Sequence, residues 1–200
     1  MKICCIGRNY VAHAKELGNE VPTDPVIFLK PATALLEAPA PFSYPSFSTD
    51  IHYECELVLR ICKEGKNIAQ GYAGNYFDAI TAGIDFTARD LQQQLKTKGL
   101  PWEKAKAFDQ SAVIGKWLTV PASSEIKFSL QKNKQVVQEG TTAHMIFNFN
   151  TIISHISEFF TLQPGDLIFT GTPAGVGPVA IGDELEGYIE NEQVFTLKVC

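Results

Sequence analysis

The sequence predicts an α+β fold in which strands dominate. Short β-rich segments recur along the whole chain, helical segments are few, and Phe is frequent, at 13 of 200 residues. Aromatic and β-branched side chains pack well on the half-buried surface of a sheet. With 45% hydrophobic and 20% charged residues, the composition excludes disorder and a coiled coil. We therefore expect residues 1–200 to form a single domain.

The first 45 residues predict two strands and one short helix. Residues 1–6 form an apolar run typical of a short buried strand, and residues 26–30 predict a strand that a proline stops. Between them, residues 10–17 predict a helix that ends at Gly18. Two turns of helix are marginal alone, so this segment must pack on something or move. Residues 31–45 are rich in Pro and Ala and predict an extended loop.

The next segment predicts the longest strand. Residues 51–62 alternate and are β-rich. Small and aromatic residues on one face favour a helix at 69–82, followed by a short strand at 83–88. Residues 89–98 predict a polar helix that ends at Gly99.

The second half predicts mostly strands. Residues 112–120 and 126–132 are expected strands, and a turn at 132–134 makes a hairpin with residues 135–139. Residues 146–160 predict a helix with one apolar face. The remaining expected elements are a strand at 167–170, a glycine-rich loop at 171–178, and closing strands at 183–189 and 194–199.

Charge and cysteine content narrow the classes of function. The net charge is −5 and no basic patch dominates, which argues against nucleic acid and an anionic membrane as partners. The uncharged stretch at 167–182 is too short and too broken by Gly and Pro to span a bilayer. The N-terminus has no signal-like apolar run. Five cysteines without metal-type spacing indicate reduced thiols, so we expect a cytoplasmic protein.

Two carboxylates stand out on the expected strand at 51–62. Side chains alternate along a strand, so Glu54 and Glu56 share one face with His52. A divalent hard cation would remove their repulsion, although a solvated strand face remains the alternative. Asp85 follows an apolar residue and precedes another, where a free carboxylate is costly. It is a third ligand, or else a helix cap or an arginine partner.

Four separated motifs occur in order along the chain. They are Gly7-Arg8-Asn9-Tyr10-x-x-His13, His52-x-Glu54-x-Glu56, Asp85-x-x-x-Arg89-Asp90 and Gly171-Thr172-Pro173-x-Gly175-Val176-Gly177. Together with Gln138-Glu139-Gly140 and Met145-Ile146-Phe147, this pattern resembles the fumarylacetoacetate hydrolase family. The similarity is greatest to its short branch of acylpyruvases, oxaloacetate decarboxylases or tautomerases, and hydroxyheptadienedioate isomerase-like proteins. The resemblance implies a mixed β-sandwich roll with a few peripheral helices, and a homodimer.

The resemblance also implies a metal centre and a water activator. Glu54, Glu56 and Asp85 would hold Mg²⁺ or Mn²⁺, leaving positions for substrate oxygens. His13 and Glu16, spaced i, i+3 on the predicted helix, would deprotonate a water. An ordinary exposed charged pair is the alternative from the residues alone. Within residues 1–30, the helix at 10–17 would act as a lid.

The remaining site residues are also implied by motif matching. Lys106 would lie near the metal and hold a substrate oxygen, with Lys104 as its rival and one of the two merely solvated. Arg89 could hold a carboxylate or simply neutralise Asp90. The residues expected to bind substrate are Arg8, Tyr10, Lys30, Arg89, Gln92 and Thr172.

The function implied by the resemblance is the metal-dependent hydrolysis of the C–C bond of short 3-acylpyruvates, through a metal-stabilised pyruvate enolate. The alternatives on the same site are oxaloacetate decarboxylation, keto–enol tautomerisation, and hydroxydiene-dioate isomerisation. The expected partner is a small 2-oxo acid substrate. A non-catalytic β-rich binding protein would leave the ordered motifs unexplained.

Overall fold

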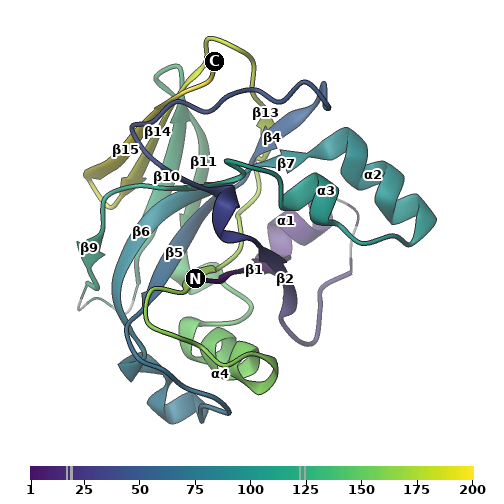
Figure 1. The fold of residues 1–200 in the computed structure, drawn as a ribbon. Helices are drawn as coiled ribbons and strands as arrows, with labels where there is room; N and C mark the ends of the chain where they lie inside the picture. Colours follow the sequence, from purple (N-terminus) through teal and green to yellow (C-terminus); the bar gives the residue numbers. More distant parts are fainter. Residues whose placement is uncertain (17, 19, 122, 124) are drawn as a thin grey trace.

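The computed structural model describes residues 1–16, 18, 20–121, 123 and 125–200. Its strands form sheets of eight, four and three strands, and its helices lie at the periphery (Figure 1). The predicted strand-dominated α+β class is confirmed. Among the helices that the structure describes, none is long and apolar enough to cross a membrane.

The eight-stranded sheet runs in the order β2-β1-β12-β5-β6-β8-β3, with β9 paired to β6. Its strands are β1 (Ile3–Gly7), β2 (Val26–Lys30), β3 (Leu35–Glu37), β5 (Cys55–Ile61), β6 (Phe77–Asp85), β8 (Ala112–Ile114), β9 (Leu118–Thr119) and β12 (Leu167–Phe169). β1 pairs antiparallel with β2 and parallel with β12. The first strand of the chain is therefore next to a strand that lies more than 150 residues away in the sequence.

The four-stranded sheet runs in the order β11-β10-β14-β15 and packs beside the long curved strands β5 and β6 (Figure 1). Its strands are β10 (Lys127–Lys132), β11 (Gln135–Thr141), β14 (Glu184–Ile189) and β15 (Glu192–Lys198). Asn133 and Lys134 have φ of 53° and 68°, which is the left-handed pair of a two-residue hairpin turn. The predicted hairpin is confirmed.

The smallest sheet changes the interpretation of residues 51–62. This segment is two strands, β4 (Ile51–Tyr53) and β5, and the chain leaves the strand conformation at Glu54. β4 pairs with β13 (Gly177–Pro178) and β7 (Thr87–Ala88), whereas β5 joins the eight-stranded sheet. The predicted single strand is wrong, because hydrophobic alternation does not show where a chain passes from one sheet to another.

Three further predictions of secondary structure are wrong. The expected strand at 112–120 is two short strands, β8 and β9, separated by residues 115–117. The expected helix at 69–82 is a 3₁₀ turn at Gln70–Asn75 followed by β6. β6 lies inside the sheet and is buried on both faces, so polar and apolar residues do not alternate along it. Its small residues therefore resemble the apolar face of a helix. The expected loop at 31–45 contains β3, which pairs parallel with β8 and forms the sheet edge.

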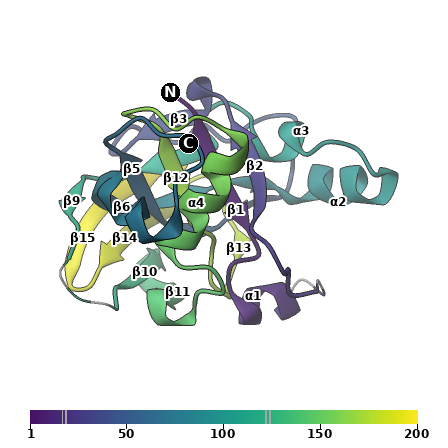
Figure 2. The same ribbon diagram turned by 90° about the horizontal axis from the view of Figure 1, so that it is seen from below.

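Within the described residues, the α-helices are α1 (Val11–Glu16), α2 (Arg89–Lys98), α3 (Glu103–Lys106) and α4 (Phe149–Phe159). α2 and α3 project together on one side of the molecule, and α4 covers another part of it (Figure 2). α2 ends at Gly99 as predicted, in the left-handed conformation. α4 begins after Asn148, whose side chain accepts a hydrogen bond from the Thr151 amide. Leu17, the last residue of the predicted first helix, lies outside the described residues.

Gly83 permits the close approach of β5, β6 and β8 behind the acidic residues. A Cβ built at this position would lie 2.4 Å from the Val113 carbonyl oxygen and 2.8 Å from a methyl of Val58. We expect Gly83→Ala to cost about 1–3 kcal/mol by overpacking, which lowers Tm by about 2–12 °C in a chain of this size. Gly71→Ala, where a Cβ meets nothing within 4 Å, is the control in thermal melts. Equal melting of both variants would contradict the close packing.

Candidate functional site

The three predicted carboxylates converge in the interior. One oxygen each of Glu54, Glu56 and Asp85 lies within 4.8 Å of the others, and all three side chains are buried. Antiparallel pairing of β5 with β6 sets Glu56 opposite Gly83, two residues before Asp85. The Asp85 amide donates to the Glu54 carbonyl oxygen at 2.8 Å, which fixes the break between β4 and β5. The backbone thus positions all three carboxylates.

Two cations lie against this carboxylate cluster. Lys106 Nζ is 2.8 Å from Glu54 Oε2 and 2.7 Å from Asp85 Oδ2, and Arg89 Nη2 is 2.7 Å from Glu54 Oε1. Burial alone would raise the pKa of Glu54, but Lys106 and Arg89 together hold it below its usual value. Burial likewise opposes the charge of Lys106, but Asp85 and Glu54 keep its pKa above the ordinary range. Glu54 is therefore a paired carboxylate.

Glu56 differs from Glu54 because no cation contacts it among the described residues. Its Oε2 accepts one hydrogen bond, from the Gly171 amide at 2.7 Å. Burial, followed by the negative charges of Asp85 and Glu54, raises the pKa of Glu56 well above its usual value. The cluster therefore lacks positive charge on the Glu56 side. A hard divalent cation such as Mg²⁺ or Mn²⁺ prefers carboxylate oxygens, so this donor set fits it.

Lys30 lies behind the cluster rather than in the wall of the cavity. Its side chain is fully buried, and Nζ is 2.7 Å from Asp85 Oδ1. The same ammonium contacts the Lys106 carbonyl oxygen and the Ser111 hydroxyl. Lys30 therefore orients Asp85, and the expectation that it contacts the substrate needs correction.

His13 and Glu16 form a hydrogen-bonded pair on α1. His13 Nδ1 is 3.1 Å from Glu16 Oε2, and Glu16 Oε1 accepts from the Gly175 amide at 3.1 Å. Glu16 thus bridges α1 and the glycine-rich loop that follows β12. The other ring nitrogen of His13 is left without a bond to Glu16. The His13 residue is 4% exposed and lines the same cavity as the carboxylates. A base held in this way suits proton transfer.

Asn9 fixes the segment that precedes α1. Its Nδ2 donates to the carbonyl oxygens of Phe147 and Thr170, and its Oδ1 accepts from the Phe147 amide at 2.7 Å. A Cβ at Gly171 would lie 2.6 Å from Asn9 Cβ, so these segments touch. The start of α1 and the Glu56-binding amide of Gly171 are therefore held by one buried contact.

Gln138 connects the start of β5 to the glycine-rich loop. Its Oε1 accepts from the Cys55 amide, which lies between the two glutamates, at 2.9 Å. Its Nε2 donates to Thr172 Oγ1 at 2.9 Å and to the Pro173 carbonyl oxygen at 3.0 Å. Because Thr172 Oγ1 accepts from Gln138, its own hydroxyl proton is free to be donated to a ligand. Gln138 belongs to a motif of the sequence but carried no predicted role.

One cavity of about 40 Å³ is surrounded by the three carboxylates, the cations, and His13 of the His13–Glu16 pair. The predicted site residues in its lining are Arg8, His13, Glu54, Glu56, Asp85, Arg89, Gln92, Lys106 and Thr172. Gln92 Oε1 accepts from Arg89 Nη1 at 2.8 Å, which holds the guanidinium against Glu54. The structure therefore brings together residues from five separate parts of the chain.

Tyr10 and His52 are not in this group. Tyr10 lines a different hollow, on the other side of α1, and packs edge-on against Phe128. Tyr10 is not among the residues that line the cavity of the carboxylates, and its expected contact with substrate stays a prediction. His52 bonds to Asp50 through Nε2 at 2.9 Å and does not line the cavity, since β4 ends before Glu54. His144 lies in the hollow of Tyr10 and is exposed.

Sequence reasoning missed six lining residues, namely Ile6, Gly7, Val26, Phe28, Lys96 and Trp102. Lys96 follows Arg89 by seven and Gln92 by four, so a helical register predicts that the three share a face. Phe28 and Trp102 carry no such signal, and their rings lie 6.3 Å apart. The sequence left Lys104 and Lys106 as rivals, and the structure places Lys106 in the cavity while Lys104 is exposed.

The fold and the site together define a class of protein. It is a β-dominated domain in which buried carboxylates, suited to a divalent cation, lie beside a candidate base. Residues 2–199 match the model of the fumarylacetoacetate (FAA) hydrolase C-terminal family. The chain belongs to the fumarylacetoacetate hydrolase family.

Similar proteins place the chain among enzymes with related chemistry. Oxaloacetate tautomerase FAHD1, mitochondrial, of Mus musculus is 40% identical over 200 residues, covering 98% of this chain and 90% of the relative. Oxaloacetate tautomerase YcgM of Escherichia coli (strain K12) is 40% identical over 190 residues, covering 92% and 86%. The crystal structure of fumarylpyruvate hydrolase from Pseudomonas aeruginosa in complex with Mn²⁺ and pyruvate is 37% identical, with a TM-score of 0.94 over 100% of this chain and 89% of that one. The family thus contains tautomerases and hydrolases.

Proposed function

We propose that the chain catalyses metal-dependent reactions of small 2-oxo acids that pass through an enolate. The buried carboxylates facing the His13–Glu16 pair across one cavity carry this proposal. The residues proposed as metal ligands are Glu54, Glu56 and Asp85. The relative that was crystallised with Mn²⁺ and pyruvate supports both the kind of metal and the kind of ligand.

Glu54, Glu56 and Asp85 would hold a divalent ion, which when bound would stabilise negative charge on the enolate of the substrate. Lys106 and Arg89 then hold the carboxylates and offset their charge. The Thr172 hydroxyl, oriented by Gln138, donates to a substrate carboxylate oxygen. His13 moves the proton, and Glu16 fixes its tautomer and position.

The first candidate reaction is the keto–enol tautomerisation of oxaloacetate. From keto to enol, a proton leaves C3 and one is added to the 2-oxo oxygen; from enol to keto, a proton leaves the enol oxygen and one is added to C3. A single base such as His13 can carry this proton in either direction. The two relatives that are 40% identical carry this activity in their names.

The second candidate is hydrolysis of a short 3-acylpyruvate, and the His13–Glu16 pair favours it. In this reaction His13 takes a proton from water, the hydroxide adds to the distal carbonyl, and the C–C bond breaks to release a carboxylic acid and the pyruvate enolate. The enolate then takes a proton at C3, which completes pyruvate. Decarboxylation of oxaloacetate and isomerisation of a hydroxydiene-dioate would use the same site.

A substrate panel distinguishes these reactions. Metal-loaded protein is given the enol form of oxaloacetate, acetylpyruvate and fumarylpyruvate, and the loss of enol absorbance and the release of pyruvate are followed separately. Loss of the oxaloacetate enol without pyruvate indicates tautomerisation, pyruvate from oxaloacetate indicates decarboxylation, and pyruvate from an acylpyruvate indicates hydrolysis. No metal-dependent reaction with any of the three would contradict the proposal.

We also propose that residues 1–200 act as one catalytic domain. The proposed assembly is a homodimer. The proposed location is a reducing compartment such as the cytoplasm. All five cysteines are free thiols, which supports the compartment. β1 pairs with β12, so segments far apart in the sequence share one sheet, which supports the single domain. Light scattering at several concentrations tests the dimer.

A further inference from the structure

His52 belongs to the same motif as Glu54 and Glu56, but it does not line the cavity and has no role in the proposed reactions. Its Nε2 lies 2.9 Å from Asp50 Oδ1. Because a carboxylate only accepts hydrogen bonds, Nε2 carries the ring proton, and Nδ1 of the neutral ring is an acceptor. Nδ1 is buried and has no hydrogen-bond partner in the part of the chain that the structure describes.

Arg89 has a buried donor in the same condition. Its Nη2 donates to Glu54 Oε1 at 2.7 Å, and its Nη1 donates to Gln92 Oε1 at 2.8 Å. The third nitrogen, Nε, carries one proton and can only donate. It is buried as well, and no described residue accepts its hydrogen bond. Buried polar atoms are nearly always paired, so these two atoms call for an explanation.

The segments that carry His52 and Arg89 are bonded to each other. β4 pairs with β7 so that His52 lies opposite Thr87, two residues before Arg89. The Arg89 amide donates to the Asp50 carbonyl oxygen at 2.8 Å, and the carboxylate of the same aspartate holds the His52 ring. Figure 1 shows β4, β7 and the start of α2 meeting at one corner of the molecule. The acceptor and the donor are therefore brought to the same place.

A side-chain bond and the charge of Arg89 support this proximity. Ser48 Oγ donates to Asp90 Oδ1 at 2.7 Å, which holds the segment before β4 against the first turn of α2. Burial, followed by the charge of Arg89, lowers the pKa of His52. The guanidinium thus acts directly on the imidazole ring, and a neutral ring offers the lone pair that a cationic donor needs.

We propose that His52 is a positioning residue for Arg89, with Nδ1 accepting the hydrogen bond of Arg89 Nε–H in direct contact or across one buried water. The guanidinium is then held at three points, by His52, Glu54 and Gln92. One N–H group remains on each Nη, and these two are available to a carboxylate of the substrate. Only this last contact rests on the proposed function.

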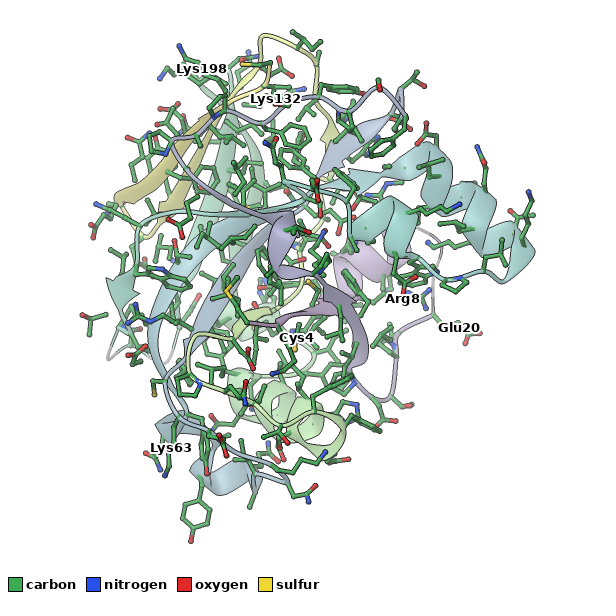
Figure 3. The ribbon with its side chains drawn as sticks, viewed as in Figure 1. Cys4, Arg8, Glu20, Lys63, Lys132 and Lys198 are labelled. Atoms are coloured by element: carbon green, nitrogen blue, oxygen red, sulfur yellow. The ribbon has the colours of Figure 1, made fainter. Side chains whose placement is uncertain are left out.

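The Arg89 Nε–H group can be observed directly by NMR. The chain has three arginines, so ¹⁵N-labelled protein gives three Nε–H signals. Arg60 donates from Nε to Asp78 at the surface, and Figure 3 shows Arg8 on the side of the molecule that carries α2 and α3. Arg60→Lys and Arg8→Lys assign their own signals and leave the third to Arg89. The exchange of this proton with water is measured on metal-free protein without substrate.

Two substitutions separate the two sides of the His52 ring. His52→Asn puts an amide oxygen near the place of Nδ1 and gives up the bond to Asp50, whereas His52→Gln reaches Asp50 and offers nothing to Arg89. Exchange of the Arg89 Nε proton should be about 10-fold faster in His52→Gln, the protection expected of one hydrogen bond. It should stay within about threefold of wild type in His52→Asn. His144→Gln, the same substitution at an exposed histidine, should change nothing.

The second measurement is the Kd of pyruvate for the Mg²⁺-loaded protein, by calorimetry. A loosened Arg89 should weaken binding about 10-fold in His52→Gln, the size of effect typical of an outer-shell contact. His52→Asn and His144→Gln should keep the Kd within about threefold. The order of the two His52 variants carries the result, because a merely structural role would not favour asparagine over glutamine.

Equal exchange rates in wild type and His52→Gln would overturn the proposal, and so would faster exchange in His52→Asn than in His52→Gln. If His52→Gln does not fold, Asp50→Ala replaces it, since this side chain is 43% exposed and its loss frees the ring at Nε2. Exchange should then be several-fold faster, and an unchanged rate would overturn the role of His52. The expected exchange rates in a protein that transforms no 2-oxo acid would refute the proposed reactions and leave this role intact.

Discussion

The Glu56→Gln variant is expected to fold at least as stably as the metal-free wild type and to lose most of its affinity for Mg²⁺ or Mn²⁺. Glu56 is buried beside two other carboxylates, and this raises its pKa, so its neutral form suits the metal-free fold. Glutamine imitates that neutral form and can still accept the hydrogen bond from the Gly171 amide. It cannot offer an anionic ligand, so affinity should fall by about 100-fold or more, beyond the usual effect of losing an outer-shell partner.

Thermal melts with and without metal test this expectation. Metal at 100 times its Kd stabilises the wild type by about 2.7 kcal/mol, a rise in Tm of about 5–11 °C for a chain of this size. The rise should vanish in Glu56→Gln at the same metal concentration. Glu37→Gln, at an exposed position, should keep it. A full rise in Glu56→Gln would exclude this residue as a ligand.

The same variant should remove a pH dependence of the metal-free protein. An unfolded glutamate ionises near pH 4.3, whereas folded Glu56 keeps its proton to a higher pH. In that interval the folded state binds more protons than the unfolded state, so Glu56 causes stability to fall as pH rises above about 4.3. Melts in EDTA at about pH 5 and about pH 7 should show a loss for the wild type that is smaller in Glu56→Gln. Equal losses would contradict the raised pKa.

His13→Ala is expected to lower kcat by about 10²–10⁴-fold, the usual contribution of a positioned general base. The affinity for Mn²⁺ should remain within about threefold, since His13 is not among the carboxylates that would hold it. Glu16→Gln should have a smaller effect, because Glu16 acts through His13 and the amide of Gly175.

Lys15→Ala is the matched control for His13→Ala, since it lies on the same helix and is exposed. It should keep kcat within about twofold. Steady-state rates with oxaloacetate enol and with acetylpyruvate give kcat, and a Mn²⁺ titration gives the affinity. A variant His13→Ala that retains full kcat on both substrates would show that another group moves the proton.

Much of the fold could be predicted from the sequence where local pattern and tertiary structure agree. The hairpin of β10 and β11, the polar helix α2 with its glycine cap, and the strand β2 all follow from local residue patterns. Besides the break between β4 and β5, the failures include β6 and β3, which are strands only because of their partners. β6 lies between β5 and β8, so both of its faces are buried and no alternation is left to detect.

The candidate site was predictable to a different degree. The motifs indicate the carboxylates and His13. The sequence predicts that Glu54 and Glu56 lie on one face because they belong to one continuous strand. In the structure the carboxylates also come together, but the chain breaks at Glu54 between two strands that pair in different sheets. The hydrogen bond from the Asp85 amide holds this break. Lys96, Phe28 and Trp102 are brought to the cavity by packing between separate segments, and no short motif encodes that. The roles of these residues remain predictions.

The parallel pairing of β1 with β12 has a consequence for the folding of the protein during its synthesis. A ribosome releases β1 first, but its partner β12 emerges only after about four-fifths of the chain has been made. Until then β1 pairs only with β2, and Asn9 and Glu56 lack their partners at Thr170 and Gly171. Contacts so distant in sequence form slowly. The nascent chain thus exposes an unpaired β1 edge, and the carboxylates of Glu54, Glu56 and Asp85 acquire their final geometry only near the end of translation.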